Sequence, residues 1–255
     1  MRICMILSSA LLLFLHSMDV FAQNTPYKQS QAHIQKHLVP FLLGYRIPGA
    51  DAPVLSSSVL LDAPLISQLP ELPRGCEVTS LAMLLQYKGL AVGKMQLAGR
   101  IRKDPAPFQQ TKGSISFGNP HYGFVGSMTS WAEPGFGVFH GPVYELANQY
   151  LPGQIINLTG HPFTVILQHL SQRKPVWVIS TSTFDYVPDR DWETWQTKRG
   201  PVCITMKEHS VLLTGYDKQY VYFNDPLASV KNRRVPMQAF VKGWDQYGRQ
   251  ALTYK

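Results

Sequence analysis

The sequence predicts an α+β fold, in which helices come first and an antiparallel β-sheet follows. Two observations support this class. Apolar residues recur at helical spacing over residues 78–85, and two β-rich runs at 210–216 and 220–224 flank a short polar connection. The chain has 255 residues, enough for one large domain or two small ones, and nothing in it requires two.

The first 22 residues have the pattern of a secretory signal peptide. Arg2 precedes an apolar run that ends near Leu15, and the small residue Ala22 precedes Gln23, where we expect cleavage. The run is too short for a membrane span, and no later stretch reaches the ~18 apolar residues that a span needs. We therefore expect an exported protein, secreted or periplasmic, with no membrane span.

Residues 23–58 lack a sustained period and contain Pro/Gly and Ser clusters, so we interpret them as an irregular extension or linker before a domain at 59–255. The formal net charge of +8 would attract an exported protein to anionic envelopes and polymers. No dense Lys/Arg run or nucleic-acid motif occurs. We expect a monomer with no nucleic-acid partner.

Cys76 is expected at the start of a buried central helix. Gly89 ends the helical pattern. Pro73 disfavours a helix before Cys76, and Gly75 allows the chain to turn sharply into the first helical residue. Free N–H groups and the helix dipole favour a thiolate at such a position, so the sequence predicts a lowered pKa for Cys76. The alternative is a buried, unreactive cysteine.

The elements between this helix and the hairpin are less regular. After a short strand at 59–61, the sequence predicts helices near 95–101, 141–150 and 162–170, a buried strand at 176–180 and another strand at 202–206. Residues 104–142 form a long Gly- and Pro-rich stretch that is typical of a cleft rim or lid. Trp192 and Trp195 could line the cleft, although plain packing is commoner for such residues.

His209 and Asp225 are expected on one face of the hairpin. If Tyr216 pairs with Tyr220, the sequence numbers of the two residues in each cross-strand pair add up to 436. His209 then lies diagonal to Asp225. An aspartate that orients a histidine, together with a cysteine, is the arrangement that nucleophilic thiol catalysis needs. Each residue alone has an ordinary structural explanation, and Asn224 is an alternative to Asp225.

The order Gln68, Cys76, His209 and Asp225 resembles exported single-domain relatives of the bacteriocin-leader-processing (double-glycine) cysteine peptidases, a papain-like group. The resemblance covers roughly residues 59–255 and is most specific at 68–85, 123–139, 175–178 and 209–226. It implies a papain-like fold whose central helix carries the nucleophile and packs on an antiparallel sheet. By the same resemblance, Cys76 is the nucleophile, His209 the base, Asp225 the orienting carboxylate and Gln68 the oxyanion-hole side chain.

Two cysteines, Cys76 and Cys203, remain after signal removal, and we expect both to be free thiols. Six extended residues would place Cys203 about 20 Å from His209, whereas a disulfide needs Cα atoms within roughly 7 Å. Cys76 therefore cannot contact His209 and also form a disulfide with Cys203, unless the chain folds back between those two residues.

These features predict a cysteine peptidase that hydrolyses a peptide or isopeptide bond through an acyl-thioester, with a peptide or protein substrate and no cofactor. Two alternatives remain open: a transglutaminase-like acyl transferase with the same triad, and a non-catalytic envelope-binding module. The histidine spacings match no metal motif, so no metal site is expected.

Overall fold

A computed structural model of the chain describes residues 55–255. The predicted signal peptide and most of the predicted extension lie outside these residues. Within them, no helix combines the length and apolar character needed to cross a membrane.

The centre of the fold is a seven-stranded antiparallel sheet with the order β12-β11-β10-β7-β13-β6, in which β1 also pairs with β10. Its longest strand, β10, lies between β7 and β11 and forms the middle of the layer. The strands span Val59–Leu60 (β1), Ile155–Asn157 (β6), Val176–Thr181 (β7), Glu208–Tyr216 (β10), Tyr220–Asp225 (β11), Val230–Pro236 (β12) and Ala251–Tyr254 (β13).

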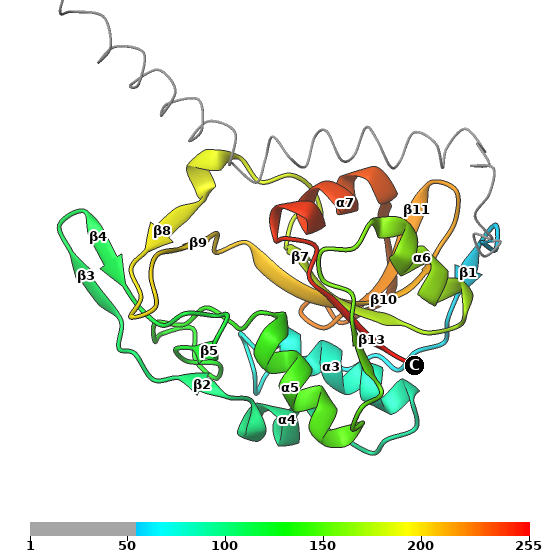
Figure 1. The fold of residues 1–255 in the computed structure, drawn as a ribbon, viewed down its shortest axis with the longest axis horizontal. Helices are drawn as coiled ribbons and strands as arrows, with labels where there is room; N and C mark the ends of the chain where they lie inside the picture. Colours follow the sequence, from blue (N-terminus) through cyan, green and yellow to red (C-terminus); the bar gives the residue numbers. More distant parts are fainter. Residues whose placement is uncertain (1–54) are drawn as a thin grey trace, which may run out of the picture. The chain divides into compact units, whose positions relative to one another are not determined.

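Helices cover both faces of this sheet (Figure 1). One face carries α3 (Cys76–Tyr87), α4 (Lys94–Arg100) and α5 (His140–Tyr150), and the other carries α6 (Phe163–Ser171) and α7 (Met237–Gln246). The first ten residues of α3 are buried, because apolar side chains surround this helix on most sides. The prediction of a buried central helix is thus confirmed.

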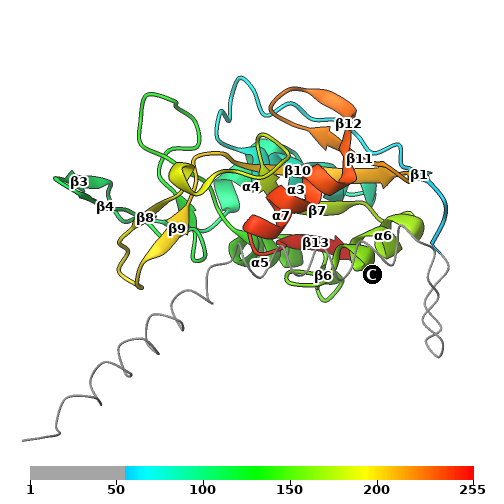
Figure 2. The ribbon, with the colours of Figure 1, turned by 90° about the horizontal axis from the view of Figure 1, so that it is seen from above.

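Short strand pairs lie beside the main sheet (Figure 1), and Figure 2 shows two of them, β3 with β4 and β8 with β9, from above. They are β2 (Lys103–Asp104) with β5 (Phe124–Val125), β3 (Gln109–Thr111) with β4 (Ser114–Ser116), and β8 (Glu193–Trp195) with β9 (Val202–Ile204). A 3₁₀ turn at Asp189–Asp191 precedes β8. The long irregular stretch predicted at 104–142 contains β3, β4 and β5, and little other regular structure.

The α+β class is confirmed, but the strict order of helices before strands is not. Strand β1 precedes α3, and α7 lies between β12 and β13 near the end of the chain. The sequence interpretation did not include β6, β12, α7 or β13. Strands β6 and β13 have only three and four residues, too few to show a period.

The register of the β10–β11 hairpin differs from prediction at its turn and agrees with it near the site. Tyr216 pairs with Val221, not Tyr220, but a bulge between Leu213 and Gly215 shifts the register by one residue. Leu212 therefore pairs with Asn224, and their residue numbers add up to 436, as predicted. The bulge thus compensates for the error in the predicted length of the turn.

Candidate active site

Cys76 is the first residue of α3, as predicted. Gly75 precedes it with φ −110°, a value open to any residue, so the glycine is needed for space instead. A Cβ on Gly75 would lie 2.6 Å from Leu72 Cβ. Because Cys76 begins the helix, its backbone N–H has no acceptor within the helix and is available to a ligand.

Two carboxyl groups surround the Cys76 thiol. Sγ lies 3.4 Å from Glu77 Oε2 and 3.9 Å from Glu208 Oε2. The cysteine is 6% exposed and Glu77 is completely buried. Helix α3 and strand β10 therefore bring together a buried thiol, a buried acid and a half-buried acid.

This environment overturns the prediction of a lowered thiol pKa. Burial raises the pKa of Cys76 well above its usual range, and the charges of Glu208 and Glu77 raise it further. A hydrogen bond from the Ser210 backbone acts in the opposite direction but is outweighed. The raised pKa favours the protonated thiol, because burial and the two neighbouring acids outweigh the helix N-terminus.

The pKa of each of the two acids is itself raised, so each holds its proton to a higher pH than an exposed glutamate does. Burial raises the pKa of Glu77 to about 7, against hydrogen bonds from backbone N–H groups and Cys76. Burial, followed by the charge of Glu77, raises the pKa of Glu208 well above its usual range. Two carboxylates this close in a buried site disfavour a second negative charge.

Glu77 also connects α3 to the Gly-rich loop and to the sheet. Its Oε1 accepts a 2.6 Å hydrogen bond from the Val138 N–H, and its backbone carbonyl accepts one of 2.9 Å from Trp177 Nε1. A Cβ on Gly137 would lie only 2.2 Å from Glu77 Oε1. The glycine therefore allows the loop to approach the acid closely.

The predicted contact between His209 and Asp225 is present. His209 Nε2 lies 2.9 Å from Asp225 Oδ1, and both residues are buried. Arg233 Nη1 donates to Asp225 Oδ2 over 2.7 Å. Asn224 does not take this role, because its side-chain amide donates to the carbonyls of Ala63 and Pro64.

Asp225 is ionised over the whole neutral range. Burial alone would raise its pKa, but the hydrogen bond and charge of His209 outweigh burial, together with hydrogen bonds from the Ala228 backbone and Arg233. The pKa of Asp225 is thereby lowered to about 2. A fixed carboxylate of this kind can set the orientation of an imidazole.

The structure does not join Cys76 to His209 by a hydrogen bond. Glu208 and His209 are consecutive residues of β10, so their side chains leave opposite faces of the strand. Glu208 points to Cys76 on the α3 face, whereas the His209 ring lies 5.8 Å from that of Phe184, which stacks on Phe240 of α7. The resting site therefore has two parts, a thiol with two acids and a His–Asp pair.

Gln68 is buried close to both parts, but its amide is already engaged. Nε2 donates to the Pro73 carbonyl over 2.7 Å, while Oε1 is buried without a hydrogen-bond partner among residues 55–255. The Gln68 backbone N–H donates to the Pro226 carbonyl over 2.9 Å, which places this loop beside the end of β11. Only the second hydrogen of Nε2 remains for an oxyanion.

Both cysteines of the described residues are free, as predicted. Cys76 is buried and Cys203 is exposed on β9. The exposed thiol is therefore an internal reference for the reactivity of the buried one.

An aromatic cavity of about 320 Å³ is lined in part by residues that are close in the chain to the thiol and its two acids. Its lining includes Arg74, Gly135 and Met206, which lie two residues before Cys76, Gly137 and Glu208. The three segments that meet at the cluster of Cys76, Glu77 and Glu208, called the acid cluster from here on, therefore also supply residues to the cavity lining. Trp131, Trp195, Phe108 and Phe117 supply its aromatic surface, and Glu133 and Glu193 its negative charge.

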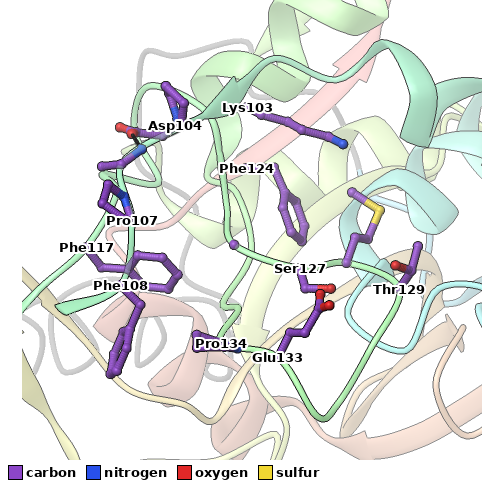
Figure 3. Close-up of a pocket in the computed structure, with 14 residues that line it drawn as sticks. Lys103, Asp104, Pro107, Phe108, Phe117, Phe124, Ser127, Thr129, Glu133 and Pro134 are labelled. Atoms are coloured by element: carbon purple, nitrogen blue, oxygen red, sulfur yellow. Dashed lines mark hydrogen bonds between the residues drawn. The ribbon is translucent and has the colours of Figure 1, made fainter. Parts of the chain in front are cut away.

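A second cavity, of about 590 Å³, shares Phe108, Phe117 and Glu133 with the first. Figure 3 shows the two phenylalanines on one side of it and Ser127 with Glu133 on another. Residues from the Gly-rich stretch line both cavities, which agrees with the predicted cleft rim.

Trp195 has a mixed role. It is 3% exposed and makes edge contacts with Phe117 and Phe136, with ring centroids 5.4 Å apart in both pairs. Packing is thus its main role, although it also lines the 320 Å³ cavity. Trp192 packs against Tyr247 at 5.3 Å and does not line either cavity.

The sequence interpretation missed Glu77 and Glu208. Each is adjacent to a predicted site residue, at positions 77 and 208. The available signal was a charged residue inside an otherwise apolar helix and at the start of an apolar strand, since such residues are rarely buried without a specific partner.

A papain-like α+β fold with a cysteine at the start of its central helix defines a class of cysteine peptidases. The model of the Peptidase_C39-like family matches residues 60–252. The chain belongs to this family, and the resemblance predicted from the sequence is confirmed.

Two individual proteins are similar to the chain. The uncharacterized protein YvpB of Bacillus subtilis is 44% identical over 195 residues, which cover 76% of this chain and 74% of that protein. A crystal structure from Bacillus anthracis, provisionally described as a C39-like peptidase, is 43% identical with a TM-score of 0.73 and covers 78% of this chain and 98% of that one. The fold is therefore shared with a solved relative.

Proposed function

We propose that this protein is an exported cysteine peptidase in which Cys76 attacks a peptide or isopeptide bond and forms an acyl-thioester. The observation that carries the proposal is the free thiol at the N-terminus of the buried helix α3. Arg74, two residues earlier, lines a cavity that could admit a side chain of the substrate. Hydrolysis by water would then release the acyl group and restore the thiol.

We retain His209 as the proposed base and Asp225 as the residue that orients it. Their 2.9 Å contact supports this pairing. Because Glu208 and His209 leave opposite faces of β10, the thiol and the imidazole must come to one side of the strand before the proton can pass. Catalytic hydrogen bonds often tighten only when substrate binds, and the proposal requires a movement of this kind.

Glu208 is a second candidate for the base when it is ionised, favoured by its 3.9 Å contact with Sγ. Glu208→Gln and His209→Gln separate the two candidates. The residue that accepts the proton is the one whose amide variant loses about 10²-fold or more in kcat. A variant of the other residue should change kcat much less.

The aromatic cavity supports a preference for a substrate with an apolar side chain next to a basic one. Trp131 is 61% exposed and Met206 is 59% exposed, and both could be covered by an apolar side chain. The lining has a net charge of −1, because it contains two acids, Glu133 and Glu193, and one base, Arg74. This charge would attract a basic side chain.

The proposal is tested with the mature protein and a mixed peptide library analysed by mass spectrometry. Cys76→Ala should abolish cleavage, whereas the matched variant Cys203→Ser should cleave at the wild-type rate. Cleavage by Cys76→Ala at the wild-type rate would refute the peptidase. Added amine that appears in the products would instead indicate the transferase, and a biological effect retained by Cys76→Ala would indicate the binding module.

Export is part of the same proposal and has its own test. N-terminal sequencing of protein recovered outside the cytoplasm should begin at Gln23. Full-length protein retained in the cytoplasm would contradict it.

A further inference from the structure

The cluster of Cys76, Glu77 and Glu208 has the composition of a metal site. One thiol sulfur and one oxygen from each carboxyl group all lie within 4.8 Å of one another. Thiolate and carboxylate are both ligands of Zn²⁺. No histidine takes part, which explains why histidine spacing in the sequence did not indicate the site.

The two sulfur–oxygen distances in the cluster are close to those of a tetrahedral zinc site. Zn–S bonds of about 2.3 Å and Zn–O bonds of about 2.1 Å at tetrahedral angles separate sulfur and oxygen by roughly 3.6 Å. The two S···O distances here are 3.4 Å and 3.9 Å. The two sulfur–oxygen pairs would therefore shift by only a few tenths of an ångström on binding an ion. The two carboxyl oxygens, which lie within 4.8 Å of each other, would have to come to about 3.4 Å.

A second observation points to a missing ligand. Glu208 Oε1 is buried and has no hydrogen-bond partner among residues 55–255. Buried carboxylate oxygens without partners are costly. A cation beside this carboxyl group would remove that cost.

The other acid is already oriented as a metal ligand. Glu77 Oε1 accepts the Val138 N–H, which leaves Oε2 directed at the thiol. Outer hydrogen bonds of this kind fix the ligands of metal sites. The missing side chain of Gly137 leaves room for this arrangement.

We propose that Cys76, Glu77 and Glu208 bind Zn²⁺, with water in the fourth position, and that the bound ion blocks the Cys76 thiol. Binding replaces the thiol proton and any protons on the two carboxyl groups, which pass to water, and no atom changes its oxidation state. The site thereby links the reactivity of the cysteine to zinc. Metal binding does not depend on the proposed peptidase activity, because it is measured without substrate.

The test uses the mature protein with Co²⁺ as a spectroscopic substitute and Zn²⁺ in competition with a chromophoric chelator. Co²⁺ should give a thiolate-to-metal charge-transfer band that Zn²⁺ abolishes. Cys76→Ala should remove the band, and Glu208→Gln should weaken Zn²⁺ binding about tenfold or more. Cys203→Ser and His209→Gln should leave band and affinity unchanged.

A second readout does not require variants and so is independent of their folding. Stoichiometric Zn²⁺ should slow alkylation of Cys76 by iodoacetamide at least tenfold, with no change at Cys203, as followed by mass spectrometry. Alkylation of Cys76 at the same rate with and without Zn²⁺, or a band that survives in Cys76→Ala, would overturn the proposal. A failure to cleave peptides would contradict the proposed peptidase activity but not the proposed zinc site.

Discussion

Cys76 Sγ lies 3.9 Å from Glu208 Oε2, across 132 positions of the chain. This contact arises because α3 packs against the face of β10 to which Glu208 points, while the next residue, His209, points to the other face. The protonation of the thiol therefore depends on a carboxyl group next to the expected base in the chain. The consequences can be measured as pH dependence, stability and rate.

The acid cluster should make the protein less stable as the pH rises. Glu77 has a pKa of about 7 in the folded chain, against about 4.3 when unfolded. A carboxyl group whose pKa is higher in the folded chain than in the unfolded chain stabilises the fold at low pH. This contribution is complete below the pKa of the unfolded chain and is lost as the pH rises through the pKa of the folded chain. Glu208 acts in the same direction.

We expect Tm to fall between about pH 4.5 and pH 7, and Glu208→Gln to flatten this slope. Thermal unfolding followed by circular dichroism at several pH values measures it. Glu145→Gln, at an exposed acid paired with Arg102, is the matched control and should keep the wild-type slope. An equal slope in Glu208→Gln and wild type would contradict the assigned burial.

Asp225→Asn should remove stability at neutral pH but not in acid. The pKa of Asp225 is about 2, below the unfolded value of about 3.9, so its contribution is present above that unfolded value and is lost as the pH falls toward 2. The shift corresponds to about 2 kcal/mol at pH 7. Urea unfolding at pH 7 and pH 3 should show a difference from wild type that shrinks at the lower pH. A difference independent of pH would contradict the pairing with His209.

Gln68→Leu tests whether the glutamine acts on the reaction or only on the loop. Loss of the hydrogen bond to Pro73 should cost about 1 kcal/mol of stability. If the remaining N–H also binds the oxyanion, kcat should fall by about 10²- to 10³-fold with little change in KM. The folded variant with wild-type kcat would limit Gln68 to a structural role.

Gly137→Ala should destabilise the site through a clash with Glu77. The added Cβ would lie 2.2 Å from Glu77 Oε1, and overpacking of a buried position costs about 1–3 kcal/mol. Gly99→Ala is the control, because a Cβ added there would have no neighbouring atom within 4 Å and alanine favours the helix. Equal unfolding free energies for the two variants would contradict the close approach.

The sequence predicted the parts of the fold that carry strong local patterns. Helix α3 had a clear apolar period and a stop at Gly89, and the hairpin had two β-rich runs, so both were found. The shared face of His209 and Asp225 followed from strand alternation. The turn count was wrong, but the bulge at Leu213 and Gly215 preserved the relationship.

The sequence could not predict which face of β10 helix α3 covers. Alternation places Glu208 and His209 on opposite faces, but the face that meets Cys76 depends on packing between elements more than 100 residues apart. Burial of the two acids depends on the same packing. The lowered pKa expected from a helix N-terminus was therefore wrong for a reason that lies outside the local sequence.

The role of Cys76 as the nucleophile is tested most directly by its modification with a peptide-like epoxide that reacts only with an activated thiol. We expect the wild-type protein to be modified at Cys76 and not at the exposed Cys203, and His209→Gln to slow this reaction about 10²-fold or more. Peptide mapping by mass spectrometry locates the adduct. Modification of Cys203 instead, or of Cys76 no faster than a free thiol of the unfolded chain, would contradict the proposed role of Cys76.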